Sequence, residues 1–298
     1  MTAVLQSRRL GKRYRHRWAL RECTLSLPAG HVVGLVGPNG AGKTTLLHLA
    51  TGLLRPTTGT IEVLGGLPAA SPAQLARVGF VAQDAPTYAG LSVADHLRLG
   101  AHLNPGWDAD LAHDRIERLG LDPRQHAGKL SGGQRAQLAL TLAIAKRPEL
   151  LILDEPIASL DPLARREFLQ SLMEFTAGHQ VSVVMSSHLM ADLERVCDYL
   201  IVLVTGRVLV AAPVEELLGT HQLVTGVRCD PATWPADWQV ISASHTDRQS
   251  TLLVRTSDPV HDPAWAVEQI GLEDLVLAYM SQAQAAAPGR TPALEVQR

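Results

Sequence analysis

The chain has 298 residues, of which 46% are hydrophobic and 19% are charged, which is enough apolar material for a packed core and excludes extensive disorder. Lysine and arginine total 27 against 29 aspartates and glutamates, giving a net charge of −2; this balance argues against non-specific nucleic-acid binding, which needs a basic excess. Three widely spaced cysteines exclude a disulfide framework and a cysteine zinc cluster. No secretion signal opens the chain, and its longest apolar run, at 199–214, is interrupted and too short to span a bilayer. We therefore expect a soluble, intracellular protein.

Strand and helix patterns alternate along the first part of the chain. Residues 20–37 contain an alternating strand, a Pro-Ala-Gly turn and a short apolar strand, and a buried helix begins near Leu46. Further strands lack alternation, as is typical of strands covered on both faces, and are predicted at 78–82, 150–153 and 181–185. We therefore predict an α/β fold whose core sheet is mainly parallel.

Two segments depart from this alternation. Residues 86–147 carry helical patterns, including 93–103 and 109–119, and we interpret them as an inserted helical subdomain. Residues 199–210 are typical of an edge hairpin with Thr205-Gly206 at its turn. The C-terminal part is predicted to form a small α/β appendix, with strands at 223–229, 240–244 and 251–256 and helices at 261–270 and 272–280.

A glycine-rich segment follows the strand that ends near Val36. It matches the phosphate-loop pattern G-x-x-x-x-G-K-[ST] in full; its glycines let backbone N–H groups converge on a phosphate, and the next helix adds its positive N-terminal end. Lys43 can reach the β- and γ-phosphates, and the Thr44 hydroxyl can ligate Mg²⁺. The alternative is a flexible glycine-rich loop, but the flanking strand and helix favour a nucleotide site. Its predicted residues are Gly37, Pro38, Asn39, Gly40, Ala41, Gly42, Lys43, Thr44 and Thr45.

Polar side chains follow three further predicted strands. Asp154 and Glu155 end the apolar run Leu-Leu-Ile-Leu, Gln83 follows the strand at 78–82, and His188 follows the strand at 181–185. Open α/β sheets bind ligands outside the carboxyl ends of their strands, so these groups should meet the phosphate loop. We expect Asp154 to hold Mg²⁺, Glu155 to polarise the attacking water, Gln83 to contact metal and water, and His188 to sense the γ-phosphate.

A second anion-binding helix start is predicted at Leu130-Ser-Gly-Gly-Gln-Arg135. Ser131 and two glycines precede an amphipathic helix and would leave the N–H groups of its first turn open to an anion. The alternative is an ordinary serine cap. A second phosphate-type helix end beside a single phosphate-loop lysine suggests that this end serves the nucleotide of another chain.

The sequence LSGGQR, placed between the phosphate loop and LILDEP, resembles the signature of the ATP-binding-cassette (ABC) ATPases, and the resemblance covers roughly residues 4–220. The C-terminal patterns predict a small α/β domain at 219–284, and residues 285–298, with two prolines, one glycine and no periodicity, are expected to be a disordered tail. The resemblance implies a cassette at 1–218. It also implies a head-to-tail dimer with two ATP molecules at its interface. Each ATP would lie between one chain's phosphate loop and the partner's Ser131, Gly132, Gly133 and Gln134, and Asp161 would link the two sites. Tyr14 is the candidate for stacking on adenine, with Trp18 as the alternative.

The resemblance also bears on the biological role. The small C-terminal domain resembles that of bacterial exporter ATPases, so we expect an ATPase that uses ATP and Mg²⁺ and drives export through separate membrane permease subunits. It would pair with itself or a homologous ATPase at the inner face of the cell membrane. The alternatives are an importer ATPase and a soluble ABC ATPase acting on a non-membrane partner; nucleic acid is not expected as a partner. The loop at 84–93, with Tyr88 and Leu91, is predicted to contact the permease.

Overall fold

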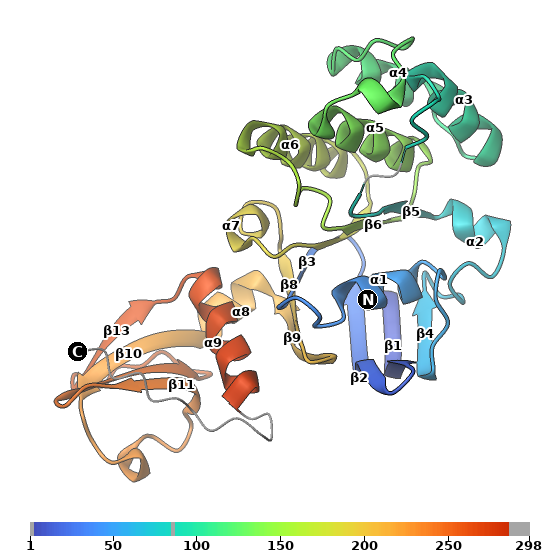
Figure 1. Cartoon of the computed structure of the whole chain (residues 1–298). Helices are drawn as coiled ribbons and strands as arrows, with labels where there is room; N and C mark the ends of the chain where they lie inside the picture. The colour runs from blue at the N-terminus through green and yellow to red at the C-terminus, as the bar shows by residue number, and fades with distance from the viewer. Residues whose placement is uncertain (1–2, 85–86, 286–298) are drawn as a thin grey trace. The chain divides into compact units, whose positions relative to one another are not determined.

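A parallel sheet lies at the centre of the first part of the chain in the computed structural model (Figure 1). Its strands in spatial order are β5 (Val78–Val81), β6 (Leu150–Asp154), β7 (Ser182–Ser186), β3 (Val32–Val36), β8 (Tyr199–Val204) and β9 (Arg207–Pro213). The pairs from β5 to β8 are parallel. Strands β3, β6, β7 and β8 are buried along their whole length, which explains their continuous Val, Ile and Leu runs. The predicted α/β fold with a mainly parallel core sheet is confirmed.

An antiparallel sheet packs beside it. This sheet has the order β2 (Arg17–Pro28), β1 (Ala3–Tyr14) and β4 (Thr58–Val63). The helix α1 (Lys43–Ala50) contacts β2, β4 and β6, and its Leu46, Leu47 and Leu49 are almost fully buried in a core that both sheets share. The shared core fixes the helix that follows the phosphate loop, so the loop itself has a rigid support.

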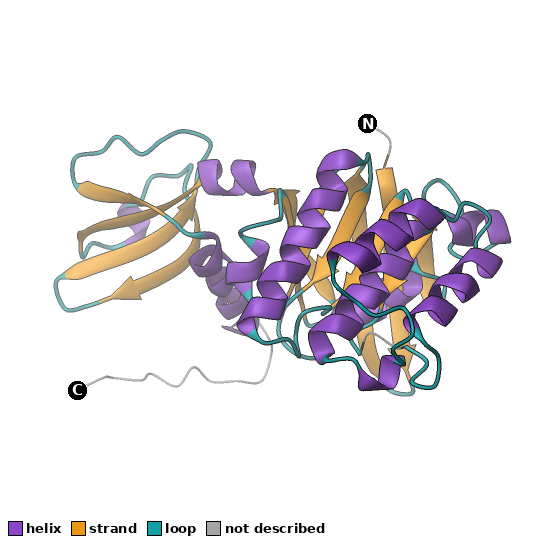
Figure 2. Cartoon of the chain, turned by 90° about the horizontal axis from the view of Figure 1, so that it is seen from above, coloured by secondary structure: helices purple, strands orange, loops and turns teal. Residues whose placement is uncertain are grey.

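Further helices lie over the strands of the first part, as Figure 2 shows from above. They are α2 (Pro72–Ala76), α3 (Val93–Leu103), α4 (Ala109–Arg118), η1 (Ala127–Lys129), α5 (Gly132–Ala145), α6 (Pro162–Gly178) and α7 (Met190–Leu193). The helices α3, α4 and α5 enclose their own apolar cluster, which includes Val93, Ile116 and Leu138. Within the described residues of the predicted helical subdomain, the chain forms helices and no strand.

The C-terminal part of the chain has a separate antiparallel sheet. Its strands in spatial order are β11 (Gln239–His245), β12 (Gln249–Arg255), β10 (His221–Val227) and β13 (Trp265–Gln269). The helices among the described residues of this part are α8 (Val214–Thr220), η2 (Pro231–Thr233) and α9 (Leu272–Ala285). Buried His221 links the sheet to α9, because its Nε2 lies 2.8 Å from the hydroxyl oxygen of Tyr279.

One element of this part was predicted wrongly. The segment at 261–270 was expected to be a helix, but it contains β13, which pairs with β10 at the edge of the sheet. Alanine, glutamate and glutamine in this segment favour a helix, whereas tertiary contacts decide the outcome. Trp265 packs against Trp238, with ring centroids 5.4 Å apart, and the edge of β10 supplies the hydrogen-bonding partner.

The structure describes residues 3–84 and 87–285, and residues 286–298 of the expected tail lie outside them. The chain divides into two compact units, residues 1–208 and 209–298, so the division falls within β9, ten residues before the boundary expected at 218. Across the described residues, no helix combines the length and apolar character that crossing a bilayer requires.

Candidate functional site

Residues from four strand ends and one hairpin line a single cavity of about 730 Å³ in the first unit. Open parallel sheets present such a site at the carboxyl ends of their strands. The structure therefore brings together most of the predicted site residues. The lining consists of Tyr14, Arg17, Ala19, Asn39, Gly40, Ala41, Gly42, Lys43, Thr44, Thr45, Gln83, Glu155, Ala158 and His188.

The phosphate loop connects β3 to α1 and wraps tightly around the start of the helix. Gly42 is the residue before α1 and has a φ of 107°, and a Cβ at this position would lie 2.5 Å from the carbonyl oxygen of Ala19. No other residue type fits this backbone conformation and contact. Lys43 opens the helix with a buried side chain, whose Nζ donates a hydrogen bond to the Gly37 carbonyl oxygen at 2.8 Å. The lysine is thereby held inside the loop.

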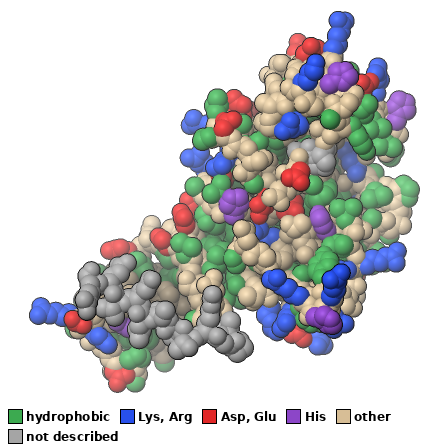
Figure 3. Space-filling model, viewed as in Figure 1, with side chains coloured by type: hydrophobic (Ala, Val, Ile, Leu, Met, Phe, Trp, Pro, Cys, Tyr) green, Lys and Arg blue, Asp and Glu red, His purple; other side chains and the backbone are tan. Residues whose placement is uncertain are grey.

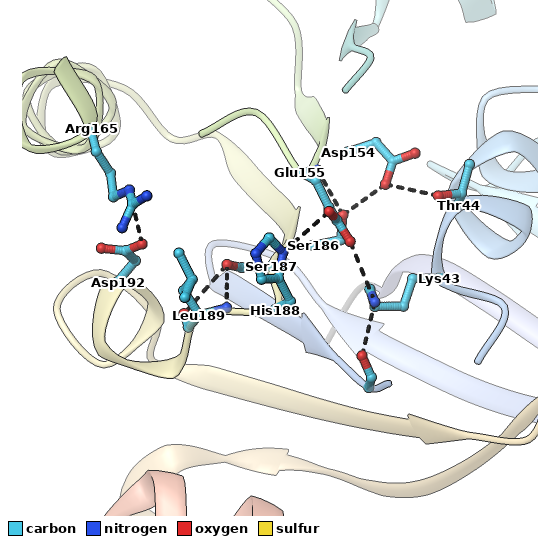
Figure 4. A network of polar contacts seen from close by, with 11 residues as sticks. Lys43, Thr44, Asp154, Glu155, Arg165, Ser186, Ser187, His188, Leu189 and Asp192 are labelled. Carbon is cyan, nitrogen blue, oxygen red and sulfur yellow. Dashed lines mark hydrogen bonds and ion pairs between the residues drawn. The ribbon is translucent and has the colours of Figure 1, made fainter. Parts of the chain in front are cut away.

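Glu155 connects Lys43 to His188, as Figure 4 shows. Its Oε1 lies 3.4 Å from Lys43 Nζ and its Oε2 lies 3.3 Å from His188 Nδ1. The Glu155 side chain is only 13% exposed, whereas that of His188, which also lines the cavity, is 45% exposed. A nearly buried carboxylate between two basic groups is held in one orientation, which is what a group that positions and deprotonates a water molecule requires.

The backbone of Glu155 is in the left-handed region, with a φ of 45°. This conformation is costly for a residue other than glycine and is found mainly where the surroundings enforce it, often at functional sites. Here the Glu155 N–H donates to Ser186 Oγ at 2.8 Å. The turn directs the carboxylate back toward the phosphate loop instead of along the strand.

Asp154 lies one residue earlier, is buried, and has a different set of partners. Its Oδ1 accepts hydrogen bonds from Thr44 Oγ1 at 3.2 Å and from Ser186 Oγ at 2.8 Å. Thr44 and Gln83 line the cavity, whereas buried Asp154 is not part of the lining and bonds Thr44. The oxygen donors in this region are therefore a hydroxyl, an amide and a buried carboxylate. Such hard oxygen donors fit Mg²⁺, which binds proteins through few ligands and keeps several waters. Magnesium at this position would supply charge neutralisation for the phosphates.

Comparison with known proteins agrees with this geometry. Residues 20–158 match the family model described as ABC transporter. The chain is 33% identical over 227 residues to the uncharacterized ABC transporter ATP-binding protein YxlF of Bacillus subtilis, covering 74% of each chain. It is also 36% identical over 230 residues to the Nod factor export ATP-binding protein I of Cupriavidus metallidurans, covering 74% of this chain and 75% of the relative. The chain belongs to the ABC transporter ATP-binding proteins. It is an ATPase of this family.

Other relatives and solved structures have the same cassette. The thiamine import ATP-binding protein ThiQ of Salmonella choleraesuis is 34% identical over 202 residues, covering 65% of this chain and 85% of ThiQ. A solved ATP-binding subunit of an ABC transporter superposes with a TM-score of 0.64 at 28% identity, covering 72% of this chain and 91% of that chain. A dimeric cassette bound to ADP and Pi superposes with a TM-score of 0.63 at 22% identity, covering 70% and 98%, and this likeness concerns the fold alone.

The signature segment of this ABC ATPase caps its own helix. Ser131 Oγ accepts a hydrogen bond from the Gln134 N–H, and Gln134 Oε1 accepts one from the Ser131 N–H, forming a capping box at the start of α5. The expectation that the first turn is entirely open to an anion therefore needs correction, because the Gln134 N–H is occupied. Gly133 packs on α6, since a Cβ there would lie 2.8 Å from Ala164 Cβ.

The signature and Asp161 lie outside the lining of the cavity. Among the described residues that line it, none comes from 131–134, and Asp161 is absent as well. Asp161 caps α6, because its Oδ1 accepts hydrogen bonds from the N–H groups of Leu163 and Ala164, both at 3.0 Å. The structure thus separates two groups of predicted residues within one chain.

The structure places the two aromatic candidates for stacking on adenine in different cavities. Tyr14 is 46% exposed and lines the cavity beside Arg17. Trp18 lines a different cavity, on the other side of β2, where the Arg13 guanidinium lies 5.5 Å from its ring. Of the two aromatic candidates, Tyr14 is therefore the one that lies in the same cavity as the phosphate loop.

Ser186 is a site residue that the sequence analysis did not select. It ends β7, is fully buried, and bridges the Asp154 carboxylate and the Glu155 backbone across neighbouring strands. Its importance comes from strand pairing, because Ser186 on β7 lies directly in register with Asp154 on the neighbouring strand β6. Its hydroxyl thus contacts both acidic residues.

We expect Ser186→Ala to lower the ATPase turnover by about tenfold, because the Glu155 turn and the Asp154 carboxylate each lose a hydrogen bond worth about 1 kcal/mol. Steady-state phosphate release and a nucleotide-binding titration would show whether turnover falls while ATP affinity stays within a few-fold of wild type. Ser187→Ala is the matched control, because the hydrogen bonds of the Ser187 hydroxyl are local, to the backbone of Leu189. Equal losses in both variants would argue against the positioning role.

Proposed function

We propose that this ABC ATPase hydrolyses ATP with Mg²⁺ between two head-to-tail chains and thereby drives export through separate membrane permease subunits. The observation that supports the proposal best is the chain of contacts from Lys43 through Glu155 to His188 inside one cavity with the phosphate loop. Through the permease, the protein would be held at the inner face of the cell membrane.

Each group in the cavity has a role that follows from its position. Lys43 and the N–H groups of the loop would bind the β- and γ-phosphates, since both lie at the start of α1. Glu155 would take a proton from the attacking water, and His188, in contact with Glu155, would contact the γ-phosphate. Thr44, Asp154 and Gln83 would hold Mg²⁺, and Tyr14 would stack on the adenine.

The separation of the phosphate loop from the signature segment within one chain supports a nucleotide site shared between two chains. The cavity is lined by the phosphate loop and the strand ends, whereas Ser131, Gly132 and Gly133 lie at another helix start of the same chain. The remaining N-terminal N–H groups of α5 have no intrahelical acceptor, so they suit an anion brought by a second copy. Asp161, at the start of α6, would link the two sites because α5 packs on α6.

Export is proposed because the C-terminal part resembles that of bacterial exporter ATPases, and the curated relatives include both an exporter and importers. The transport direction is testable in inverted membrane vesicles that contain the chain and its co-purified membrane subunits. Export predicts ATP-dependent accumulation inside these vesicles; ATP-dependent uptake into right-side-out cells instead would support the importer alternative.

The loop after Gln83 is the proposed contact with the permease. Tyr88 is 66% exposed, and its ring stacks on His96 with centroids 6.2 Å apart. Buried His96 also holds the loop, because its Nε2 accepts a hydrogen bond from the Tyr88 N–H at 3.0 Å. Leu91 is only half-buried and pairs through its carbonyl with Ala127. Tyr88 is therefore the better probe of docking; Ala85 and Pro86 lie outside the described residues.

We expect Tyr88→Asp to leave the basal ATPase of the isolated chain near wild type and to reduce co-purification with membrane subunits by about tenfold or more, because a charge would replace an exposed aromatic contact. Leu67→Asp is the control, since Leu67 is similarly exposed, at 64%, but lies in a different loop. A soluble partner that co-purifies in place of the permease would favour the non-membrane alternative. Loss of basal ATPase in Tyr88→Asp would contradict the proposal that this loop contacts the permease.

A further inference from the structure

Two β-bulges face each other in the antiparallel sheet of the first unit. The pairing of β1 with β2 shifts between Ser7 and Leu10 and again between Leu10 and Lys12. Because of the first shift, the consecutive residues Arg8 and Arg9 both face solvent. Because of the second shift, the consecutive residues Arg21 and Glu22 on β2 also both face solvent. A regular strand would send every second side chain into the core, so the bulges create a charged surface that simple alternation could not produce.

The backbone at both bulges is in an unusual conformation. Arg9 has a φ of 47° and Glu22 a φ of 50°, although neither is a glycine. On the third strand, Gly59 has a φ of 70°, and a Cβ there would lie 2.3 Å from the Arg9 carbonyl oxygen. Residues with a positive φ thus occur on each of three adjacent strands. Such conformations persist where the surroundings over-determine them, and they often accompany a binding function.

The bulges border a cavity of about 760 Å³ that has a strong excess of positive charge. Its lining includes four arginines, Arg8, Arg9, Arg21 and Arg207, but a single carboxylate, Glu22, and one wall is Trp18. Glu22 is 3.7 Å from Arg9 and 3.9 Å from Arg207, so it forms two long ion pairs. The whole chain carries a net charge of −2, so the excess of positive charge is a local property of this cavity. Figure 3 shows Lys and Arg side chains gathered over the region of β1, β2 and β4.

We propose that this cavity is a second ligand site, distinct from the nucleotide pocket, that binds a small phosphorylated molecule carrying at least two negative charges. Guanidinium groups bind phosphate oxygens in pairs, and four of them around a concave surface match a compact polyanion. The concavity favours a small ligand over the broad face of a membrane. The strand β2 separates the two cavities, because Arg17 and Ala19 line the nucleotide pocket whereas Trp18 and Arg21 line this one.

The test uses inorganic pyrophosphate as the probe and the full chain in equilibrium dialysis at low salt. Wild-type chain should bind pyrophosphate at the phosphate loop and at the basic cavity. Lys43→Ala should lose the first of these sites, and the double variant Arg8→Ala/Arg207→Ala should weaken the second by at least tenfold while its ADP affinity remains unchanged. Arg8→Lys/Arg207→Lys should give an intermediate loss, because lysine keeps the charge but not the paired donors.

The control is Arg124→Ala/Arg248→Ala, which removes the same charge from exposed positions elsewhere and should bind pyrophosphate like wild type. The proposal is overturned if Lys43→Ala alone abolishes all pyrophosphate binding, or if the control weakens binding as much as the Arg8 and Arg207 variant. It is also overturned if the arginines matter only for binding to phosphatidylglycerol vesicles or to RNA, with phosphatidylcholine vesicles as the neutral comparison.

Discussion

Replacing Glu155 with glutamine should leave ATP binding intact and reduce turnover by about 10²-fold or more, the size of effect expected when a general base is lost. Glutamine keeps the shape of the side chain and can still face Lys43 and His188, which lie 3.4 and 3.3 Å from the carboxylate oxygens. It cannot accept a proton from water. A binding titration with ATP and a steady-state phosphate-release assay on the same preparation separate the two effects.

Lys43→Ala is the complementary variant and should lose ATP binding as well as turnover. The lysine is the cationic side chain that opens α1 within the phosphate loop, so its loss should weaken ATP binding before any chemistry takes place. Lys146→Ala is a control for the removal of a half-buried lysine, because Lys146 bonds the Val78 carbonyl oxygen and does not line the nucleotide cavity. Wild-type turnover in Glu155→Gln would refute its role as the base.

The second large effect concerns assembly. Glu155→Gln should move from the monomer to the dimer position on size exclusion when ATP and Mg²⁺ are present, because two unhydrolysed nucleotides would then bridge the chains. ADP should not cause this shift, since it lacks the γ-phosphate that the partner's signature would bind. Multi-angle light scattering on the eluted peak gives the mass directly.

Adding Ser131→Arg to this background should abolish the shift and leave nucleotide binding to the single chain intact, because the signature lies outside the nucleotide cavity of its own chain. Ser71→Arg is the matched control. Ser71 also caps a helix by accepting the N–H of the residue three positions later, but at α2 and not in the signature. If both serine variants stop dimerisation, the loss reflects helix capping and not nucleotide bridging.

The sequence predicted the strand ends of the site because parallel strands deliver their carboxyl ends to one edge. Gln83, Glu155 and His188 were selected on this ground, and the structure places all three in the lining of one cavity with Lys43. The same reasoning extended to the fold, because uninterrupted Val, Ile and Leu runs identify strands covered on both faces.

Other features have no sequence signal of this kind. Ser186 matters through its register opposite Asp154, which depends on strand pairing and not on residue type. The left-handed backbone of Glu155 and of Arg9 occurs at residues that are not glycines, so composition gives no warning of it. The strand β13 carries helix-favouring residues and forms only because β10 offers a free edge for pairing.

Mixing two inactive variants tests the shared site most directly. In a dimer of one Lys43→Ala chain with one Ser131→Arg chain, one site carries both defects, whereas the other combines an intact phosphate loop with an intact signature. We predict that each variant alone is inactive and that an equal mixture recovers up to about a quarter of the wild-type ATPase rate, because half of the randomly formed symmetric dimers are mixed and each has one intact site of two. A mixture no more active than the two separate variants, or a Ser131→Arg chain that is fully active alone, would contradict the shared site.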